Sequence, residues 1–273
     1  RLQGFTGQLG RFQALIATPG GGSTAVDTSA VVVASGCLIH PSAGAGEREI
    51  GLATMESLLA ETSDKPLTWQ DRPVRDVVYL LDRTDDAIKI HTVNAIKQSL
   101  LLRERGCRVA VFARDLKVSV AGMERLYRTA REKGVIFYKY DDPPAISREE
   151  GQRSVIVRDS TVLKKEDRGM ISVPFDLAVL GETFSPDPDG EDLCRLLRLR
   201  PGANGFLMDD NPQFQRVLTN RRGIFVAGAC RFPQVVSESL TEARAAAEEV
   251  KALLRSGAYT PAGPLAEVDP RKC

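Results

Sequence analysis

The sequence predicts an α/β fold built on parallel sheets. Apolar runs of strand length occur at residues 30–34, 77–81, 108–113, 135–138, 175–180 and 223–229. Continuous runs are typical of strands that are covered on both faces, as parallel strands are. Two amphipathic helices are expected at 92–105 and 120–130, and Gly106 and Gly134 follow them as stop signals. The strand–helix–strand order between residues 77 and 138 predicts the core of a nucleotide-type domain.

Composition and charge exclude several classes of protein. The 273 residues are 42% hydrophobic and 27% charged, which is typical of a globular protein with a packed core. The net charge is +1, so no overall field would attract nucleic acid or an anionic membrane. All apolar runs are far shorter than the roughly 20 residues that cross a bilayer, so we expect no membrane-spanning segment.

The five cysteines are widely spaced and never occur as Cys-x-x-Cys. This pattern predicts no disulfide framework, zinc site or iron–sulfur site in the chain, and it favours a reducing, cytoplasmic location. His40 and His91 lack an evident carboxylate companion and are interpreted as solvated or loop histidines, so no metal site is expected. Arg1 is not an initiating methionine and no signal-peptide pattern follows it, so we expect a fragment or a processed product.

Smaller elements are expected on either side of the apolar strands. Two hairpins are predicted, residues 11–18 with 24–35, and residues 154–158 with 171–173 around a charged tip at 164–168. Short helices are predicted at residues 52–60 and 193–197.

A long helix is predicted at residues 237–255. Ser239 and Glu242 have the spacing of a capping box at its start, and Gly257 stands where a C-cap belongs. The helix has one apolar side, formed by Leu240, Ala243, Ala247, Val250 and Leu254.

The junction between the strand at 223–229 and this helix carries the most chemistry. Because Gly228 has no Cβ, a ligand could approach the backbone there, and the following helix N-terminus would stabilise a partial negative charge. An ordinary βα junction in a doubly wound sheet can have the same pattern, so both interpretations stay open. Cys230 is either redox-active or, as is commoner for a lone cysteine, a small buried apolar residue.

Three segments resemble two-dinucleotide-domain flavoproteins of the thioredoxin-reductase type. Residues 219–229 resemble the phrase Thr-x-x-x-Gly-Ile-Phe-Ala-x-Gly-Asp, which ends the flavin domain of those proteins. Residues 30–36 resemble their Ala-Thr-Gly strand, and residues 175–181 resemble the strand that returns from their second domain. The three segments also occur in the expected order, which adds specificity that none has alone.

The second domain narrows the resemblance to the A-type subunits of heterodisulfide reductase. Residues 121–135 resemble their phrase Gly-x-Glu-x-Leu-Tyr-x-x-Ala-Arg-Glu-x-Gly-Val, and residues 95–100 resemble their Lys-Gln-Ala helix. Residues 227–233 have alanine where flavoproteins usually have aspartate and then reach proline, as that family does. The resemblance covers residues 10 to 255.

The resemblance implies three-layer FAD/NAD(P)-binding (Rossmann-like) domains, an incomplete flavin-type domain with an inserted nucleotide-type domain and small β-hairpins. We expect the parts to be residues 1–70 (flavin-type domain), 71–183 (inserted NAD(P)-type domain), 184–257 (return to the flavin-type domain) and 258–273 (an extended tail). The resemblance implies contacts with FAD at Ser35, Gly36, Gly181, Gly228, Ala229, Cys230 and Pro233. It implies no catalytic acid–base residue in this chain.

Two departures from the family pattern limit this interpretation. Residues 82–91 have neither the family's cysteines nor the glycines of a phosphate loop, so we do not expect the inserted domain to bind NAD(P), and Arg114 is interpreted as a solvated charge. No Gly-x-Gly-x-x-Gly occurs anywhere, and Gly44, Gly46 and Gly51 have the wrong spacing for it. The ADP half of FAD therefore has no cradle in these residues: that segment belongs to a preceding part of the polypeptide or to a partner subunit, or the site has decayed.

Two functions follow from the resemblance. The first is membership of a heterodisulfide-reductase-type complex of anaerobic metabolism, in which shared FAD relays electrons to iron–sulfur centres on other subunits. The second is a degenerate, non-catalytic scaffold within such a complex. An autonomous NAD(P)H-dependent disulfide reductase is disfavoured, because the chain has no cysteine pair and no nicotinamide loop.

Overall fold

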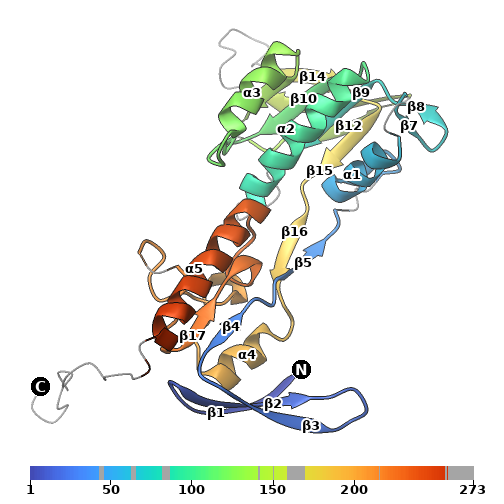
Figure 1. Cartoon of the computed structure of the whole chain (residues 1–273). Helices are drawn as coiled ribbons and strands as arrows, with labels where there is room; N and C mark the ends of the chain where they lie inside the picture. Colours follow the sequence, from blue (N-terminus) through green and yellow to red (C-terminus); the bar gives the residue numbers. More distant parts are fainter. Residues whose placement is uncertain are drawn as a thin grey trace, which may run out of the picture. The chain divides into compact units, whose positions relative to one another are not determined.

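The computed structural model describes residues 1–42, 46–62, 66–81, 87–140, 142–149, 151–158, 170–214, 216–255 and 257. The chain forms two compact units, of which the first comprises Arg1–Gly36, Pro186–Arg231 and Val236–Cys273 and the second Cys37–Ser185 and Phe232–Val235 (Figure 1). The charged tip predicted at 164–168, the tail from 258 and residues 82–86 of the glycine-free segment that replaces the phosphate loop lie outside the described residues.

The second unit is built around a parallel sheet of five described strands in the order β11-β10-β9-β15-β6. These strands are β6 (Glu49–Gly51), β9 (Asp76–Leu80), β10 (Arg108–Ala113), β11 (Ile136–Lys139) and β15 (Leu177–Leu180). The helices of this unit are α1 (Leu52–Glu61), α2 (Ile88–Glu104) and α3 (Met123–Glu132). A three-stranded antiparallel sheet follows α3 and β11, with strands β12 (Ala145–Glu149), β13 (Gln152–Arg158) and β14 (Met170–Pro174).

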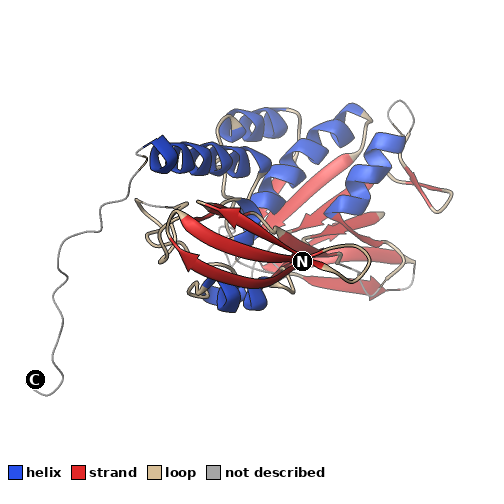
Figure 2. Ribbon diagram, turned by 60° about the horizontal axis from the view of Figure 1, so that its bottom comes forward, coloured by secondary structure: helices blue, strands red, loops and turns tan. Residues whose placement is uncertain are grey.

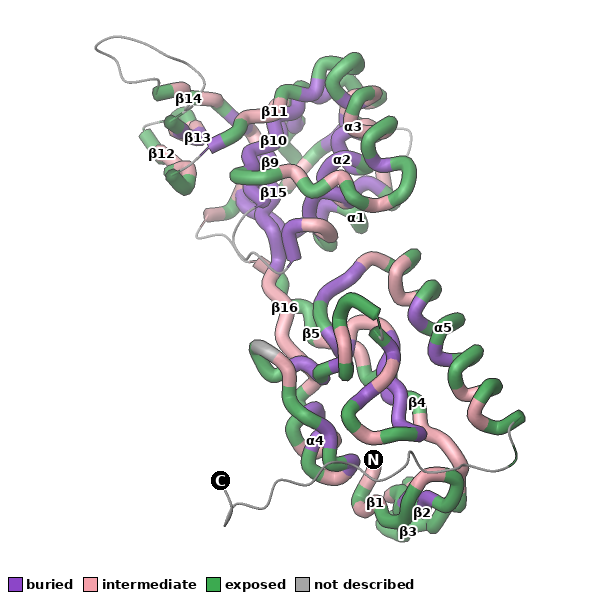
Figure 3. Tube along the Cα trace, turned by 90° about the vertical axis from the view of Figure 1, so that its left-hand side faces the viewer, coloured by how far each residue is buried: buried purple, intermediate pink, exposed green. Residues whose placement is uncertain are grey.

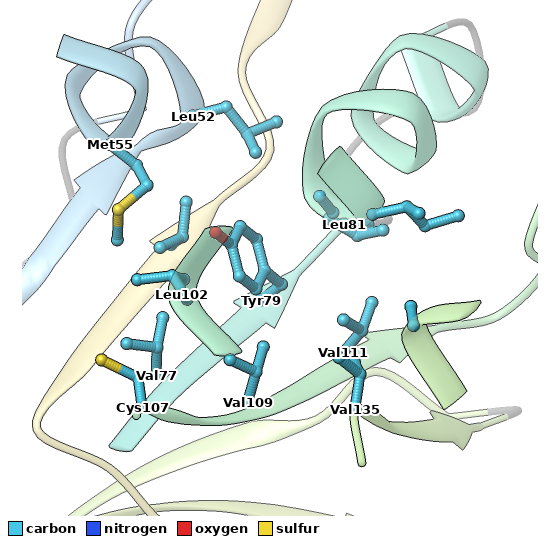
Figure 4. Close-up of a cluster of buried hydrophobic side chains, with 14 of the residues drawn as sticks. Leu52, Met55, Val77, Tyr79, Leu81, Leu102, Cys107, Val109, Val111 and Val135 are labelled. Atoms are coloured by element: carbon cyan, nitrogen blue, oxygen red, sulfur yellow. The ribbon is translucent and has the colours of Figure 1, made fainter. Parts of the chain in front are cut away.

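Alternate residues of the parallel strands face two different cores. Val77 and Tyr79 of β9 belong to one buried cluster together with residues of all three helices, such as Leu102 of α2 (Figure 4). Val78 of β9 instead belongs to a second cluster, with Val155 of the antiparallel sheet. The unit therefore has three layers, helices, parallel sheet and antiparallel sheet (Figure 2). Burial on both faces explains the continuous apolar runs, and it confirms the predicted α/β fold.

The sequence predicts a two-stranded hairpin from residues 154–158 and 171–173. The structure has a three-stranded sheet there, because β12 also pairs with β13. The predicted domain boundary near residue 70 also differs from the observed division, which falls between Gly36 and Cys37. The physical reason is that β6 pairs in parallel with β15, so β6 and the helix after it join the second unit. Two short strand pairs complete this region, β7 (Thr68–Trp69) with β8 (Arg72–Pro73) and β5 (Cys37–His40) with β16 (Thr183–Pro186).

The first unit contains an antiparallel sheet and a short parallel pair. The antiparallel strands are β1 (Leu2–Gln8), β2 (Arg11–Ala17) and β3 (Ser23–Thr28), and the parallel pair is β4 (Val31–Val33) with β17 (Ile224–Val226). The single strand predicted at 24–35 is thus two strands in two sheets. The break falls at residues 29 and 30, where the Thr28 hydroxyl donates a hydrogen bond to the Ala30 carbonyl.

A helix packs on each face of the parallel pair, and on the α5 side it is β17 that is covered. Ile224 and Val226 pack in a cluster with Leu197 of α4 (Gly190–Leu197), whereas Phe225 packs with Ala246 of α5 (Val236–Arg255). Two turns of 3₁₀ helix, η2 (Ala203–Gly205) and η3 (Gly228–Cys230), occur in the connecting segments.

Helix α5 departs from its prediction at its start and in its buried face. It begins at Val236, so Ser239 lies inside the helix and does not cap it, while Gly257 has the positive φ of 61° that its predicted C-cap position requires. Glu242 and Ala246 are the buried residues of the helix. Four of the five residues on the predicted apolar side are exposed, among them Leu240 at 54% and Leu254 at 53% (Figure 3).

Candidate functional site

The carboxyl ends of β4 and β17 bring five of the predicted contact residues to one place in the first unit. The two strands pair in parallel register, with Val33 opposite Val226. Beyond that pair, the Ala227 N–H donates to the Val33 carbonyl over 3.0 Å, and the Cys230 thiol donates to the same carbonyl over 3.4 Å. Ser35 and Gly36 therefore follow one strand end, and Gly228, Ala229 and Cys230 follow its neighbour.

Both glycines at these strand ends have left-handed backbone. The φ of Gly36 is 80° and that of Gly228 is 79°. Residues that have a Cβ rarely adopt this backbone conformation. A Cβ on Gly36 would meet nothing within 4 Å, and one on Gly228 would meet only the Ser239 side chain, at 3.8 Å. Backbone conformation, and not crowding by the protein, explains glycine at both positions. The space in front of each is open.

A buried ionic network fixes the turn after β17. The Gly228 N–H donates to the Glu242 carboxylate over 2.9 Å, and the Arg231 guanidinium donates to the carboxylates of Glu242 and Asp209. All three charged side chains are buried, so each depends on the others to offset the loss of water. The network holds η3 against α5.

The sequence had no signal for this role of Glu242. Its spacing from Ser239 suggested a helix cap, and α5 contains several other glutamates. The first turn of α5 also carries Glu238, whose charge competes with an anionic ligand for the helix N-terminus.

Cys230 is a buried thiol and not a reactive one. Its side chain is 3% exposed, and burial raises its pKa to about 11. The thiol also donates toward the Ala227 carbonyl over 3.3 Å. These surroundings support the interpretation of Cys230 as a small core residue.

We expect Cys230 to resist alkylation in the folded protein. With a pKa of about 11, only about one thiol in a thousand is ionised at pH 8, and the rate should rise as pH increases towards that pKa. Iodoacetamide labelling at pH 8, followed by peptide mass spectrometry, should modify the partly exposed Cys37 first. Equal labelling of the two cysteines before unfolding would instead identify Cys230 as a redox-competent thiol.

The other two predicted contact residues, Gly181 and Pro233, belong to the second unit, whereas the five residues at the strand ends belong to the first. A Cβ on Gly181 would stand 2.6 Å from the Leu81 carbonyl oxygen and 2.8 Å from Nδ1 of His91. Tight packing in its own unit thus accounts for this glycine. Pro233 is buried within the Phe232–Val235 stretch.

His91 is fully buried, contrary to its interpretation as a solvated or loop histidine, because it lies in α2 with Nδ1 3.0 Å from the Leu81 carbonyl. Burial lowers its pKa, which favours the neutral ring. His40, in contrast, is exposed and lies 2.7 Å from the Ser185 hydroxyl. Neither histidine belongs to a group of three or more metal-ligating side chains, and no such group occurs among the described residues.

Replacement of Gly181 by alanine should destabilise the second unit. The added methyl must displace the Leu81 carbonyl or the His91 ring, and overpacking of this kind costs about 1–3 kcal/mol. Gly190→Ala is the matched control, since its Cβ would meet only one atom, 3.9 Å away, on a helix. Urea denaturation of both variants tests this. A Gly181→Ala protein as stable as Gly190→Ala would show that packing does not explain the glycine.

The order and direction of the strands place this chain among α/β proteins with Rossmann-like folds. No family profile matches the chain. No described helix is long and apolar enough to cross a membrane.

Comparison with curated proteins confirms the resemblance to the A-type subunits of heterodisulfide reductase. The iron–sulfur A-type subunit of the CoB–CoM heterodisulfide reductase of Methanocaldococcus jannaschii is 26% identical over 167 residues, which are 60% of this chain and 25% of that protein. One of the corresponding A-type subunits of Methanopyrus kandleri is 26% identical over 182 residues, 66% of this chain and 27% of that protein. The chain thus spans about a quarter of the length of these relatives.

A solved structure, the sulfide:quinone oxidoreductase of Aquifex aeolicus, aligns with 91% of this chain and 58% of its own, at 13% identity and a TM-score of 0.49.

Proposed function

We propose that this chain contributes the C-terminal part of an FAD site in a heterodisulfide-reductase-type electron-transfer complex. The observation that carries the proposal is the pair of adjacent parallel strand ends, where Gly36 and Gly228, both partly exposed, leave open space in front of the backbone. Ser35, Gly36 and Ala229 would contact the flavin through their backbone, Gly228 would leave room for its close approach, and the buried Cys230 would hold the two strand ends together. When bound, FAD supplies the redox chemistry, and the protein supplies binding and orientation.

The phosphate cradle must then come from elsewhere. A helix N-terminus preceded by a glycine-rich turn is the usual holder of a pyrophosphate, and this sequence has no such turn. We therefore propose that FAD is shared with another polypeptide segment. The first relatives are subunits of heterodisulfide reductases, which supports membership of a multi-subunit complex. That the partners carry flavin and iron–sulfur centres, and that the complex is cytoplasmic, are parts of the proposal.

A non-catalytic scaffold is the second candidate, and the Glu242 network favours it. Glu242 already takes the Gly228 N–H, so that donor is not available to a cofactor. Ala229 also stands where flavoproteins usually have aspartate. A scaffold would keep the same fold and the same partners but bind no flavin.

The visible spectrum of the complex purified with its natural partners distinguishes the two functions. We expect flavin bands at about 375 and 450 nm, which are typical of FAD. A colourless complex that releases no flavin on denaturation would establish the scaffold.

Gly228→Ala should lower the flavin content of that complex by more than half. The methyl group would enter the open space in front of the strand end, in addition to straining the backbone. Gly10→Ala is the matched control: Gly10 also has a φ of 79° and open surroundings, but it lies in the turn between β1 and β2. FAD released per complex is measured for both. Equal flavin content in the two variants would contradict the assignment of Gly228 as a contact.

A further inference from the structure

The buried ionic network of the first unit carries more negative than positive charge. The Arg231 guanidinium lies between the carboxylates of Glu242 and Asp209, and all three residues are at most 8% exposed. One cation is thus shared by two anions, so the three side chains together hold one negative charge in excess. A buried charge is screened by water and salt much less than an exposed one. The excess charge therefore acts on the groups that border the network.

This excess charge lies directly behind the proposed flavin contact at Gly228. The Gly228 N–H donates to the Glu242 carboxylate over 2.9 Å. Two bonds of about 1.5 Å each separate this nitrogen from the position of a Cβ on Gly228, so the carboxylate lies within about 6 Å of that position. The same position borders the open space in front of the strand end. A group bound in this space would therefore lie close to a buried negative charge.

Glu238 adds a further negative charge at the start of α5. It stands in the first turn of the helix, is partly buried, and lines one hollow together with Glu242. The helix N-terminus itself is equivalent to only about half a positive charge, so the charge of Glu238 outweighs it. Arg216 lines the same hollow, but it is exposed, and water screens its charge. The turn after β17 and the start of α5 thus present a negative potential.

The contacts of Asp209 indicate that its charge does more than anchor a segment. Its carboxylate accepts from Arg231, but the segment that carries it is already tied to the turn, because the Leu207 N–H donates to the Cys230 carbonyl over 2.9 Å. A neutral asparagine would also accept a hydrogen bond from Arg231, without the cost of burying a second anion. Packing therefore does not account for two carboxylates around one guanidinium, whereas a bound group that responds to their charge would.

We infer that the excess charge of Arg231, Glu242 and Asp209 makes the strand ends favour an oxidised flavin ring over a reduced one. Two electrons and one proton convert the neutral oxidised ring into an anion, and nearby charges are a means by which proteins tune a flavin. The buried carboxylates repel the anion and leave the neutral ring almost unaffected, so the reduction potential of the flavin is lowered. The inference rests on the proposed function, because it concerns the flavin that Gly228 would approach.

The test compares the reduction potential of the flavin in variants of the complex, purified with its natural partners and titrated with dithionite. Glu242→Gln and Asp209→Asn each remove one buried negative charge, and the new amide still accepts a hydrogen bond from Arg231. We expect each variant to favour the oxidised ring about tenfold less, which raises a two-electron potential by about 30 mV. Glu248→Gln is the matched control, because it removes the same charge from an exposed position of α5, and it should change the preference less than about twofold.

Sulfite binding gives a second readout, which needs no electron donor. The sulfur of sulfite forms a bond with a ring nitrogen of the oxidised flavin, and its electron pair leaves the ring with a negative charge and without its visible band. We expect the dissociation constant for sulfite to fall about tenfold in Glu242→Gln and in Asp209→Asn, and to stay within about twofold in Glu248→Gln. A network that only positioned the turn would change the amount of flavin and not its preference for negative charge.

Several results would overturn the inference. Unchanged potential and sulfite affinity in both buried variants would contradict it alone, since flavin in the complex would still support the proposed function. A wild-type complex without flavin would contradict the two together. Equal shifts in Glu248→Gln would show that burial is not the cause. Asp209→Asn, whose carboxylate bonds to Arg231 and not to Gly228, keeps the test valid if Glu242→Gln loses flavin. Loss from both variants would show that the carboxylates act through contact and not through charge.

Discussion

The Glu242 carboxylate organises the strand ends of the first unit. It accepts the Gly228 N–H and an Arg231 hydrogen bond at a buried position, and Arg231 also reaches Asp209. Removing one member would leave the others buried without a counter-charge, which costs several kcal/mol. The left-handed turn at Gly228 and the position of α5 are therefore set together. Whatever binds at these strand ends meets a turn whose geometry is fixed in advance.

The second unit could be predicted largely from the sequence, and the reason lies in its strands. Residues 77–81 and 108–113 are continuous apolar runs because Val77 and Val78 point into different cores. Such runs indicate parallel strands even when the strands with which they pair are not known. Strand β12 was missed because its residues are only partly buried and carry charges, so its place depends on pairing with β13.

The buried face of α5 could not be predicted, because it depends on contacts from distant residues. An apolar stripe along a helix usually marks the face that packs on the core. In α5 the buried face instead carries Glu242, whose burial is possible only because Arg231 and Asp209 surround it. The reasons for two glycines could not be predicted from the sequence either, although Gly181 and Gly228 both follow buried strands. Gly181 is required because the His91 ring lies close to it, and Gly228 is required because its φ is positive.

Among the described strands β4 pairs with β17 alone, and its other, uncovered edge has a consequence for how the protein exists in a cell. A free apolar strand edge can pair with any unfolded chain nearby, so a protein that exposes one is prone to aggregation. A partner that covers the edge stabilises the folded state by mass action. Copies of the chain in which this edge stays uncovered should therefore be removed by proteolysis faster than copies in which it is covered.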